Sequence, residues 1–242
     1  MADPVSFREY YLRRIGVVTP LPEAWLGHAK PVGVADEPPT ASAPAAGRGE
    51  NEPLSPSIDL DELARQAANC TACELARTRN KVVFGVGNPH ADILFIGEAP
   101  GRDEDLKGEP FVGRAGQLLD GMLAALGLDR GSVYIMNVIK CRPPNNRDPS
   151  PEEVRACARW FEPQWEAISP KVVCLLGRVA AQRVLETTAP LALLRGRWHE
   201  KRGAPVLVTY HPAYLLRSPA QKARAWEDLR ALRRRWLELR ED

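Results

Sequence analysis

The chain lacks long apolar runs and carries almost no net charge, and both shortages limit what it can be. No stretch of 18 apolar residues occurs among its 242 residues, so we expect no membrane-spanning segment. The formal net charge is only +2, which does not by itself indicate a nucleic-acid partner. We find no internal repeat. The length and a 44% hydrophobic content fit one sizeable domain with an extension.

The first 57 residues differ in composition from the rest of the chain. Asp3 and Glu9 interrupt the N-terminus, so we expect no secretory signal peptide and a cytoplasmic protein. Residues 1–30 form an N-terminal segment with helical apolar spacing, which would dock either onto the protein itself or onto a protein partner. Residues 31–57 are rich in Pro, Ala and Gly, which is typical of a disordered linker. We therefore expect one folded domain over 58–242.

Cysteine is scarce, and its five copies are unevenly placed. Cys70 and Cys73 form a C-x-x-C pair, Cys141 lies in a basic, proline-broken stretch, and Cys157 lies on a predicted helix. In a cytoplasmic chain such a pair favours a metal or redox site over a disulfide. If the fold brings all four thiolates together, they suit zinc or an iron–sulfur cluster. Cys174 lies within an apolar run and is expected in the core.

Apolar runs alternate with amphipathic stretches from residue 58 onward. This alternation predicts an α/β fold, a three-layer sandwich whose central, mostly parallel sheet has four strands flanked by helices. Ser150, Pro151 and Glu153 together form a helix-start signal. We expect strands over 91–96, 133–137, 171–176 and 206–210, and a candidate edge strand at 82–84. Helices are expected near 59–69, 116–126, 179–185 and 219–239, with a further helix starting at 150–153.

Polar residues follow the predicted strands at the points where these strands end. An acidic loop covers 97–105, Asn137 closes the next strand, and His211 follows the last. Because ligands bind beyond the carboxyl ends of parallel strands, these groups should share one cleft. Phe111 lies on the same long loop as the acidic residues and adds an aromatic platform. An amide, an imidazole and an aromatic ring together suit a planar heterocycle such as a nucleobase.

Three of these stretches resemble the type-4, iron–sulfur uracil-DNA glycosylases: Gly97–Gly101, Asn137–Arg147 and His211–Ala213. The cysteine spacing resembles that family too, and the similarity covers about 65–235. The resemblance implies a uracil-DNA glycosylase-like fold and a DNA repair enzyme. Such an enzyme flips uracil out of DNA and hydrolyses its N-glycosidic bond, leaving an abasic site. No lysine stands at a motif position as an obvious Schiff-base nucleophile, so we expect a monofunctional hydrolase, acting as a monomer on uracil-containing DNA.

The resemblance also implies a role for individual residues. Phe111 would stack on the flipped uracil, and Asn137 would read its O4 and N3. His211 would stabilise the negative charge on O2 of the leaving base. Glu98 and Glu104 would organise the pocket and the attacking water.

Further positions are implied to bind the substrate or the cofactor. The substrate-binding set adds Gly97, Ala99, Gly101 and Asn146 to the residues above. The ligands of a 4Fe–4S cluster would be Cys70, Cys73, Cys141 and Cys157. We expect phosphate contacts from Lys140, Arg142, Arg147 and Arg217.

Two other functions remain open from the residues alone. A non-catalytic iron–sulfur protein that binds DNA would need the cysteines and the basic loop but no reaction. The acidic loop together with His211 would alternatively bind Mg²⁺ in a metal-dependent nuclease.

Overall fold

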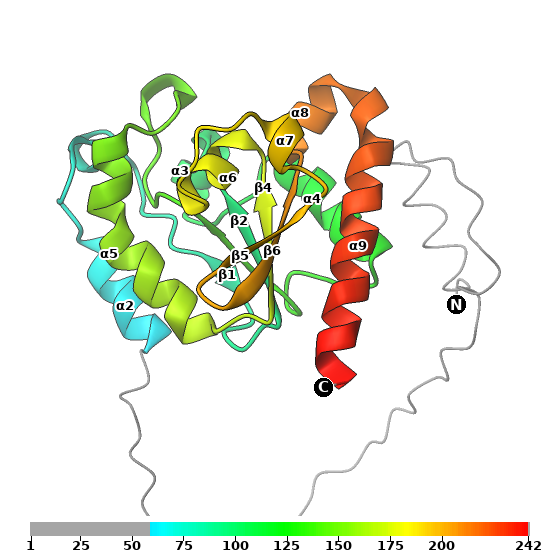
Figure 1. Cartoon of the computed structure of the whole chain (residues 1–242). Helices are drawn as coiled ribbons and strands as arrows, with labels where there is room; N and C mark the ends of the chain where they lie inside the picture. The colour runs from blue at the N-terminus through cyan, green and yellow to red at the C-terminus, as the bar shows by residue number, and fades with distance from the viewer. Residues whose placement is uncertain (1–58, 242) are drawn as a thin grey trace, which may run out of the picture. The chain divides into compact units, whose positions relative to one another are not determined.

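A mixed six-stranded sheet forms the centre of the computed structural model, which describes residues 59–241 (Figure 1). The strand order is β1-β3-β2-β4-β6-β5, and the four inner strands run parallel. The strands are β1 (Val86–Gly87), β2 (Ile93–Gly97), β3 (Tyr134–Asn137), β4 (Val172–Leu176), β5 (Trp198–Lys201) and β6 (Ala204–Thr209).

The predicted four-stranded parallel core is confirmed, but the predicted strand number is wrong because each edge carries an additional antiparallel strand. β1 pairs with β3 over two residues, and it lies at Val86–Gly87 rather than at the expected 82–84. β5 pairs with β6 as a hairpin. Arg202 and Gly203 turn this hairpin with φ of 52° and 75°, the left-handed backbone that tight hairpin turns need. β5 alternates exposed and half-buried residues and lacks the apolar run of the inner strands.

Helices cover both faces of the sheet, as the alternating pattern predicts. On one face, alternate strand residues such as Leu94, Val173 and Val206 pack with Trp165 of α5 and Ala181 of α6. α9 contacts β4 and β6, whereas α2 and α5 lie side by side on the opposite flank (Figure 1). The longer helices are α2 (Leu60–Ala68), α4 (Arg114–Ala125), α5 (Pro151–Ile168), α6 (Arg178–Val184) and α9 (Lys222–Glu241).

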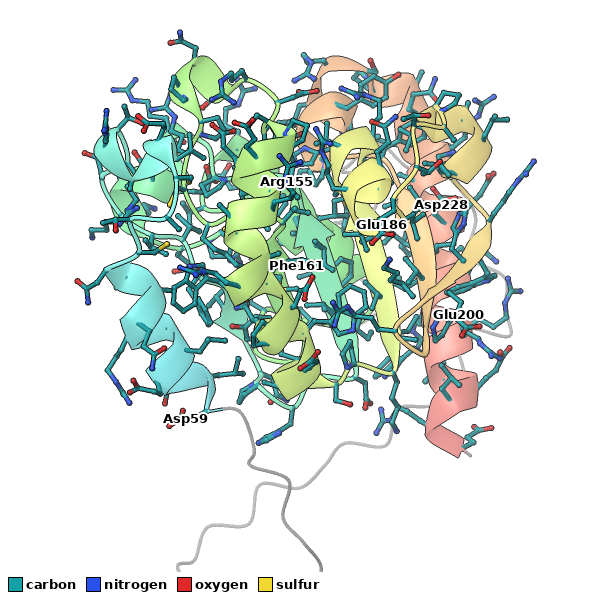
Figure 2. All side chains as sticks on the ribbon, turned by 60° about the vertical axis from the view of Figure 1, so that its left-hand side comes forward. Asp59, Arg155, Phe161, Glu186, Glu200 and Asp228 are labelled. Carbon is teal, nitrogen blue, oxygen red and sulfur yellow. The ribbon has the colours of Figure 1, made fainter. Side chains whose placement is uncertain are left out.

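Side chains fasten these helices at identifiable points. Ser150 caps α5 by accepting from the Glu153 N–H, and the Glu153 carboxylate accepts from the Ser150 N–H, as predicted. In Figure 2, α5 crosses in front of the sheet at Arg155 and Phe161. Asp228 of α9 is buried and accepts a 2.7 Å hydrogen bond from the Thr209 hydroxyl at the end of β6.

Two segments expected to be loops are short helices instead. The acidic stretch forms α3 (Arg102–Lys107), and the residues after His211 form α8 (Pro212–Arg217). The remaining short helical turns are α7 (Leu191–Leu194), η2 (Glu74–Arg77), η3 (Pro144–Asn146) and η4 (Pro219–Gln221). Within the residues that the structure describes, no helix is long and apolar enough to span a membrane.

Candidate active site and cysteine cluster

The inner strands end at the same edge of the sheet, and a cleft of about 540 Å³ opens there. Residues from loops far apart in the sequence line it because parallel strands bring their carboxyl ends together. Eight predicted site residues line this one cleft: Glu98, Ala99, Gly101, Glu104, Phe111, Asn137, Asn146 and His211.

Gly97, the ninth predicted pocket residue, is not among the residues that line the cleft, but it lies against the Asn137 and Phe111 side chains. A methyl group placed on it would lie 2.4 Å from Asn137 Oδ1 and 2.6 Å from Phe111 Cζ. Only glycine therefore leaves room for a ligand between the amide and the ring.

Asn137 presents an unsatisfied polar atom beside this space. The residue closes β3 and is 2% exposed, yet its Oδ1 accepts no hydrogen bond from any of residues 59–241. Leaving a buried acceptor unpaired costs about 1–3 kcal/mol, so such groups are rare outside functional sites. The amide is arranged for a ligand that offers a hydrogen-bond donor.

Phe111 forms the wall opposite the amide and has a strained backbone. Its φ is 55°, in the left-handed region, which costs a non-glycine residue roughly 1–2 kcal/mol. Gly116 permits this bend, because a methyl group there would lie 1.7 Å from the Phe111 carbonyl oxygen. The ring is 5% exposed and its centroid lies 5.6 Å from that of His211.

His211 caps α8 and faces the cleft at the same time. Its Nδ1 accepts from the Ala213 N–H at 3.1 Å, so the neutral ring carries its proton on Nε2. Burial, reinforced by the Arg217 charge, lowers the pKa of His211 to about 4. The imidazole is therefore neutral near pH 7 and acts as a hydrogen-bond donor through Nε2. His211 therefore combines the structural task of capping α8 with a place in the cleft.

Glu98 is a partly buried carboxyl group on the cleft wall. Burial, with a smaller contribution from Asp148, raises its pKa to about 7, although Arg178 and Arg183 act in the opposite direction. A carboxylate whose pKa lies near the working pH is suited to accept a proton from water.

Glu104, in contrast, uses its carboxylate to hold backbone. Its Oε1 accepts from the N–H groups of Val112 at 2.9 Å and Gly113 at 3.0 Å, and its Oε2 accepts from Gly101 at 3.1 Å. It therefore joins the start of α3 to the loop that carries Phe111.

Asp105, the next acidic residue on the helix, is equally engaged. Its carboxylate accepts from the backbone and side-chain nitrogens of Asn80 at 2.9 and 2.5 Å. These contacts leave neither Glu104 nor Asp105 free to bind a divalent cation, which weakens the nuclease interpretation.

Asn146 lies at the exposed rim of the cleft. Its Oδ1 accepts from Arg142 Nε at 2.7 Å, and its φ is 53°. Arg147 forms a bidentate ion pair with Glu153, with distances of 2.8 and 2.5 Å. Arg217 is exposed and lines the cleft.

The expectation that Lys140 contacts phosphate is wrong. This lysine is 1% exposed, and its Nζ donates to the Asn137 carbonyl at 2.9 Å and to Gln164 Oε1. The rings of Phe84 and Phe161 each have their centroid 5.7 Å from Nζ. Burial lowers the pKa of Lys140 to about 7. Lys140 lies in a basic stretch, so the local sequence gives no sign that residues distant in the sequence bury this side chain.

The four spaced cysteines line one small cavity between α2, η2, the 139–141 segment and α5. Cys70 and Cys73 are partly buried, and Cys141 and Cys157 are buried. Two donors point at sulfur, since Arg79 Nη1 lies 3.5 Å from Cys141 Sγ and the Lys140 N–H lies 3.2 Å from Cys157 Sγ. Cys174 is 0% exposed in β4, as expected of a core residue.

The thiols are not arranged for one mononuclear ion. Across residues 59–241, no three His, Cys, Asp or Glu side chains come close enough to hold a single metal ion. Zinc with Zn–S bonds of about 2.3 Å would need its sulfurs no more than about 4 Å apart. Burial raises the pKa of Cys141 to about 12 and also raises that of Cys157, so a bound cation is needed to ionise them.

Arg178 and Asp148 belong to the site but were not predicted. Arg178 follows β4 and donates to Asp148 at 2.7 Å, and both line the cleft beside Glu98. The strand-end rule that identifies Asn137 and His211 applies to Arg178 as well. No local pattern points to Asp148.

Comparison with known proteins agrees with this geometry. Residues 84–230 match the family model described as the uracil DNA glycosylase superfamily. The chain is 52% identical to a type-4 uracil-DNA glycosylase of Archaeoglobus fulgidus over 171 residues, covering 66% of this chain and 84% of the relative. A Thermotoga maritima type-4 enzyme is 43% identical over 169 residues, with coverage of 68% and 87%. This chain therefore belongs to the uracil DNA glycosylase superfamily and, within it, to the type-4 uracil-DNA glycosylases.

Proposed function

We propose that this protein removes uracil from DNA by hydrolysing the N-glycosidic bond, which leaves an abasic site for repair. The observation that carries the proposal is the buried, unpartnered Oδ1 of Asn137 beside Phe111. Uracil offers its N3–H to that oxygen and its O4 to the Asn137 side-chain N–H. Cytosine has an acceptor at N3 and a donor at C4, so it places the wrong group against each end of the amide.

The flipped base would stack on Phe111 with its O2 near His211. As the glycosidic bond breaks, the base leaves with negative charge that is shared with O2, and a neutral imidazole donates a hydrogen bond to it through Nε2. Stabilising this charge is the main electrostatic task of the site. Full proton transfer is not needed, which agrees with a His211 pKa of about 4.

Water would attack the sugar carbon with Glu98 as its base. The support for this role is a half-ionised carboxyl on the cleft wall with a pKa of about 7. Glu104 serves as a positioning residue rather than a catalytic one, because its carboxylate is occupied by three backbone N–H groups.

Of residues 59–241, those that line the cleft include no lysine, so no amine is placed there to form a Schiff base with the sugar. This supports a monofunctional hydrolase. DNA phosphates would contact Arg142, Asn146 and Arg217 at the rim. Gly97, Ala99 and Gly101 provide the close backbone wall of the base pocket.

The cysteine cavity would hold a 4Fe–4S cluster through Cys70, Cys73, Cys141 and Cys157. The support is that all four thiols line one cavity, as a cluster held by four cysteine thiolates requires. The cluster would act as a cross-link, tying the loop after Asn137 to α2 and α5. Its iron would supply the charge that keeps the buried thiols ionised.

We further infer that the enzyme acts in the cytoplasm as a monomer, and that residues 1–30 provide a docking segment for a protein partner. The support is compositional: the chain offers a single predicted domain, and the segment has helical apolar spacing ahead of a Pro/Ala-rich linker.

The test is an abasic-site assay on a single-uracil oligonucleotide in EDTA, with a cytosine oligonucleotide as control. Alkali-sensitive product from the uracil strand alone is the expected result. Binding without excision would favour the non-catalytic DNA-binding module, and backbone cleavage that EDTA abolishes would favour the nuclease.

A further inference from the structure

Arg130 contacts the loop that carries the stacking ring, although it lies on the segment between α4 and β3. Its Nη2 donates to the Phe111 carbonyl, and its Nη1 donates to the Pro110 carbonyl at 3.0 Å. Two carboxylates hold the guanidinium: Glu109 at 3.1 Å and Asp120 at 2.7 Å. The arginine side chain is 24% exposed, so these contacts are partly shielded from water.

The Phe111 conformation needs such support. Its φ of 55° is unfavourable for a phenylalanine, and its carbonyl is turned toward the chain at Gly116. The two successive carbonyls at 110 and 111 both accept from this one guanidinium group. A planar guanidinium supplies two parallel N–H donors at the spacing that this requires, whereas an ammonium group does not.

We propose that Arg130 is a positioning residue for uracil excision, which holds the Phe111 ring at the distance and tilt at which it stacks on the flipped base. The inference rests on the proposed function, since it specifies how the aromatic wall of the same cleft is kept in place. Arg130 itself does not line the cleft and does not touch the base.

We expect substitution of Arg130 to slow catalysis because it displaces the Phe111 ring. Displacing a stacking group by about 1 Å costs up to about 100-fold in rate, because the base then misses its attack geometry. Arg130→Gln should lower single-turnover uracil excision roughly 10- to 100-fold. Arg130→Lys should recover only part of it, because the ammonium group satisfies the carboxylates but not both carbonyls.

A double-mutant cycle with Phe111→Ala tests whether Arg130 acts through the Phe111 ring. If Arg130 acts through the ring, Arg130→Gln costs less than about twofold in the Phe111→Ala background. An equal loss in both backgrounds would show a merely structural role and overturn the proposal. The same cycle is run with Arg130→Lys, so that poor folding of the Gln variant leaves the test intact.

Arg202→Gln is the matched control. Arg202 is 31% exposed and also pairs with two carboxylates, Glu162 at 3.3 Å and Glu166 at 3.0 Å, at the turn of the β5–β6 hairpin. The Arg202→Gln variant should excise uracil at the wild-type rate. A wild-type protein that does not excise uracil refutes the proposed function itself. If the wild-type protein excises uracil but the Arg130 substitution causes an equal loss with and without Phe111→Ala, only the role of Arg130 is refuted.

Discussion

At the scale of single residues, each polar group in the cleft is defined by what it bonds and what it lacks. His211 uses one ring nitrogen for the helix cap and leaves the other as a donor. Asn137 leaves one oxygen without a partner in the part of the chain that the structure describes. Such unmet bonding capacity in a buried cleft is the mark of a binding site, because stability alone would not preserve it.

His211→Ala should lower single-turnover uracil excision by about 100- to 1,000-fold, the scale seen when one oxyanion donor is lost. The contact strengthens only as charge develops on the base, so affinity for uracil-containing DNA should change little. Rapid-quench excision and a filter-binding titration measure the two quantities separately. Wild-type excision, or a defect explained entirely by lost DNA binding, would remove His211 from its assigned role.

The pH dependence should follow Glu98. A base must be ionised to act, and the Glu98 pKa is raised to about 7, so excision should fall about tenfold per pH unit below 7 and level off above about 8. With a pKa of about 4, His211 adds no step between pH 5 and 8. Glu98→Gln should be slow and flat across this range. An unchanged pH step in that variant would assign the base to another group.

At the scale of elements, the helices, the inner strands and the helix caps could largely be predicted from the sequence. The edge strands and the burial of individual polar side chains could not. The inner strands are apolar runs and α5 carries a full capping signal, so local sequence identifies them. β1 has only two residues, and β5 alternates without a strong apolar face. Their pairing depends on neighbours that are distant in the sequence.

The residues of the candidate site likewise divide into those that the sequence predicts and those whose surroundings depend on distant neighbours. Strand ends placed Asn137 and His211 correctly, because topology alone brings them together. The burial of Lys140 depends on Phe84, Phe161 and Gln164, which lie up to 56 residues away from it in the sequence. No local sequence pattern indicates that Lys140 is buried, and a lysine within a basic stretch is ordinarily exposed.

The elements that carry the cysteines should differ sharply in their sensitivity to substitution. The purified protein should be brown with about four iron atoms per chain. Cys157→Ala on α5 should lose most of this iron, whereas Cys174→Ala in β4 should keep all of it, because that thiol lies in the core away from the cavity. Iron and zinc analysis by plasma emission checks both variants. Stoichiometric zinc without iron in the wild type would contradict the cluster.

At the scale of the whole molecule, the lining of the cleft and of the cysteine cavity, as far as residues 59–241 supply it, lies between 67 and 217. The preceding sequence is a separate compositional region rich in Pro and Ala. Removing 1–57 should therefore leave single-turnover excision and iron content within about twofold of the full chain, because linker composition cannot build a core. A truncated protein that folds but does not excise uracil would place part of the catalytic machinery in the removed segment.

The base-reading role of Asn137 is the central claim, and single-turnover excision by Asn137→Asp on matched uracil and cytosine oligonucleotides tests it most directly. A carboxylate repels uracil O4 but accepts from the cytosine amino group. The account predicts a sharp loss on uracil and a uracil-to-cytosine rate ratio shifted toward cytosine. Wild-type uracil excision by this variant, with the ratio unchanged, would contradict the account.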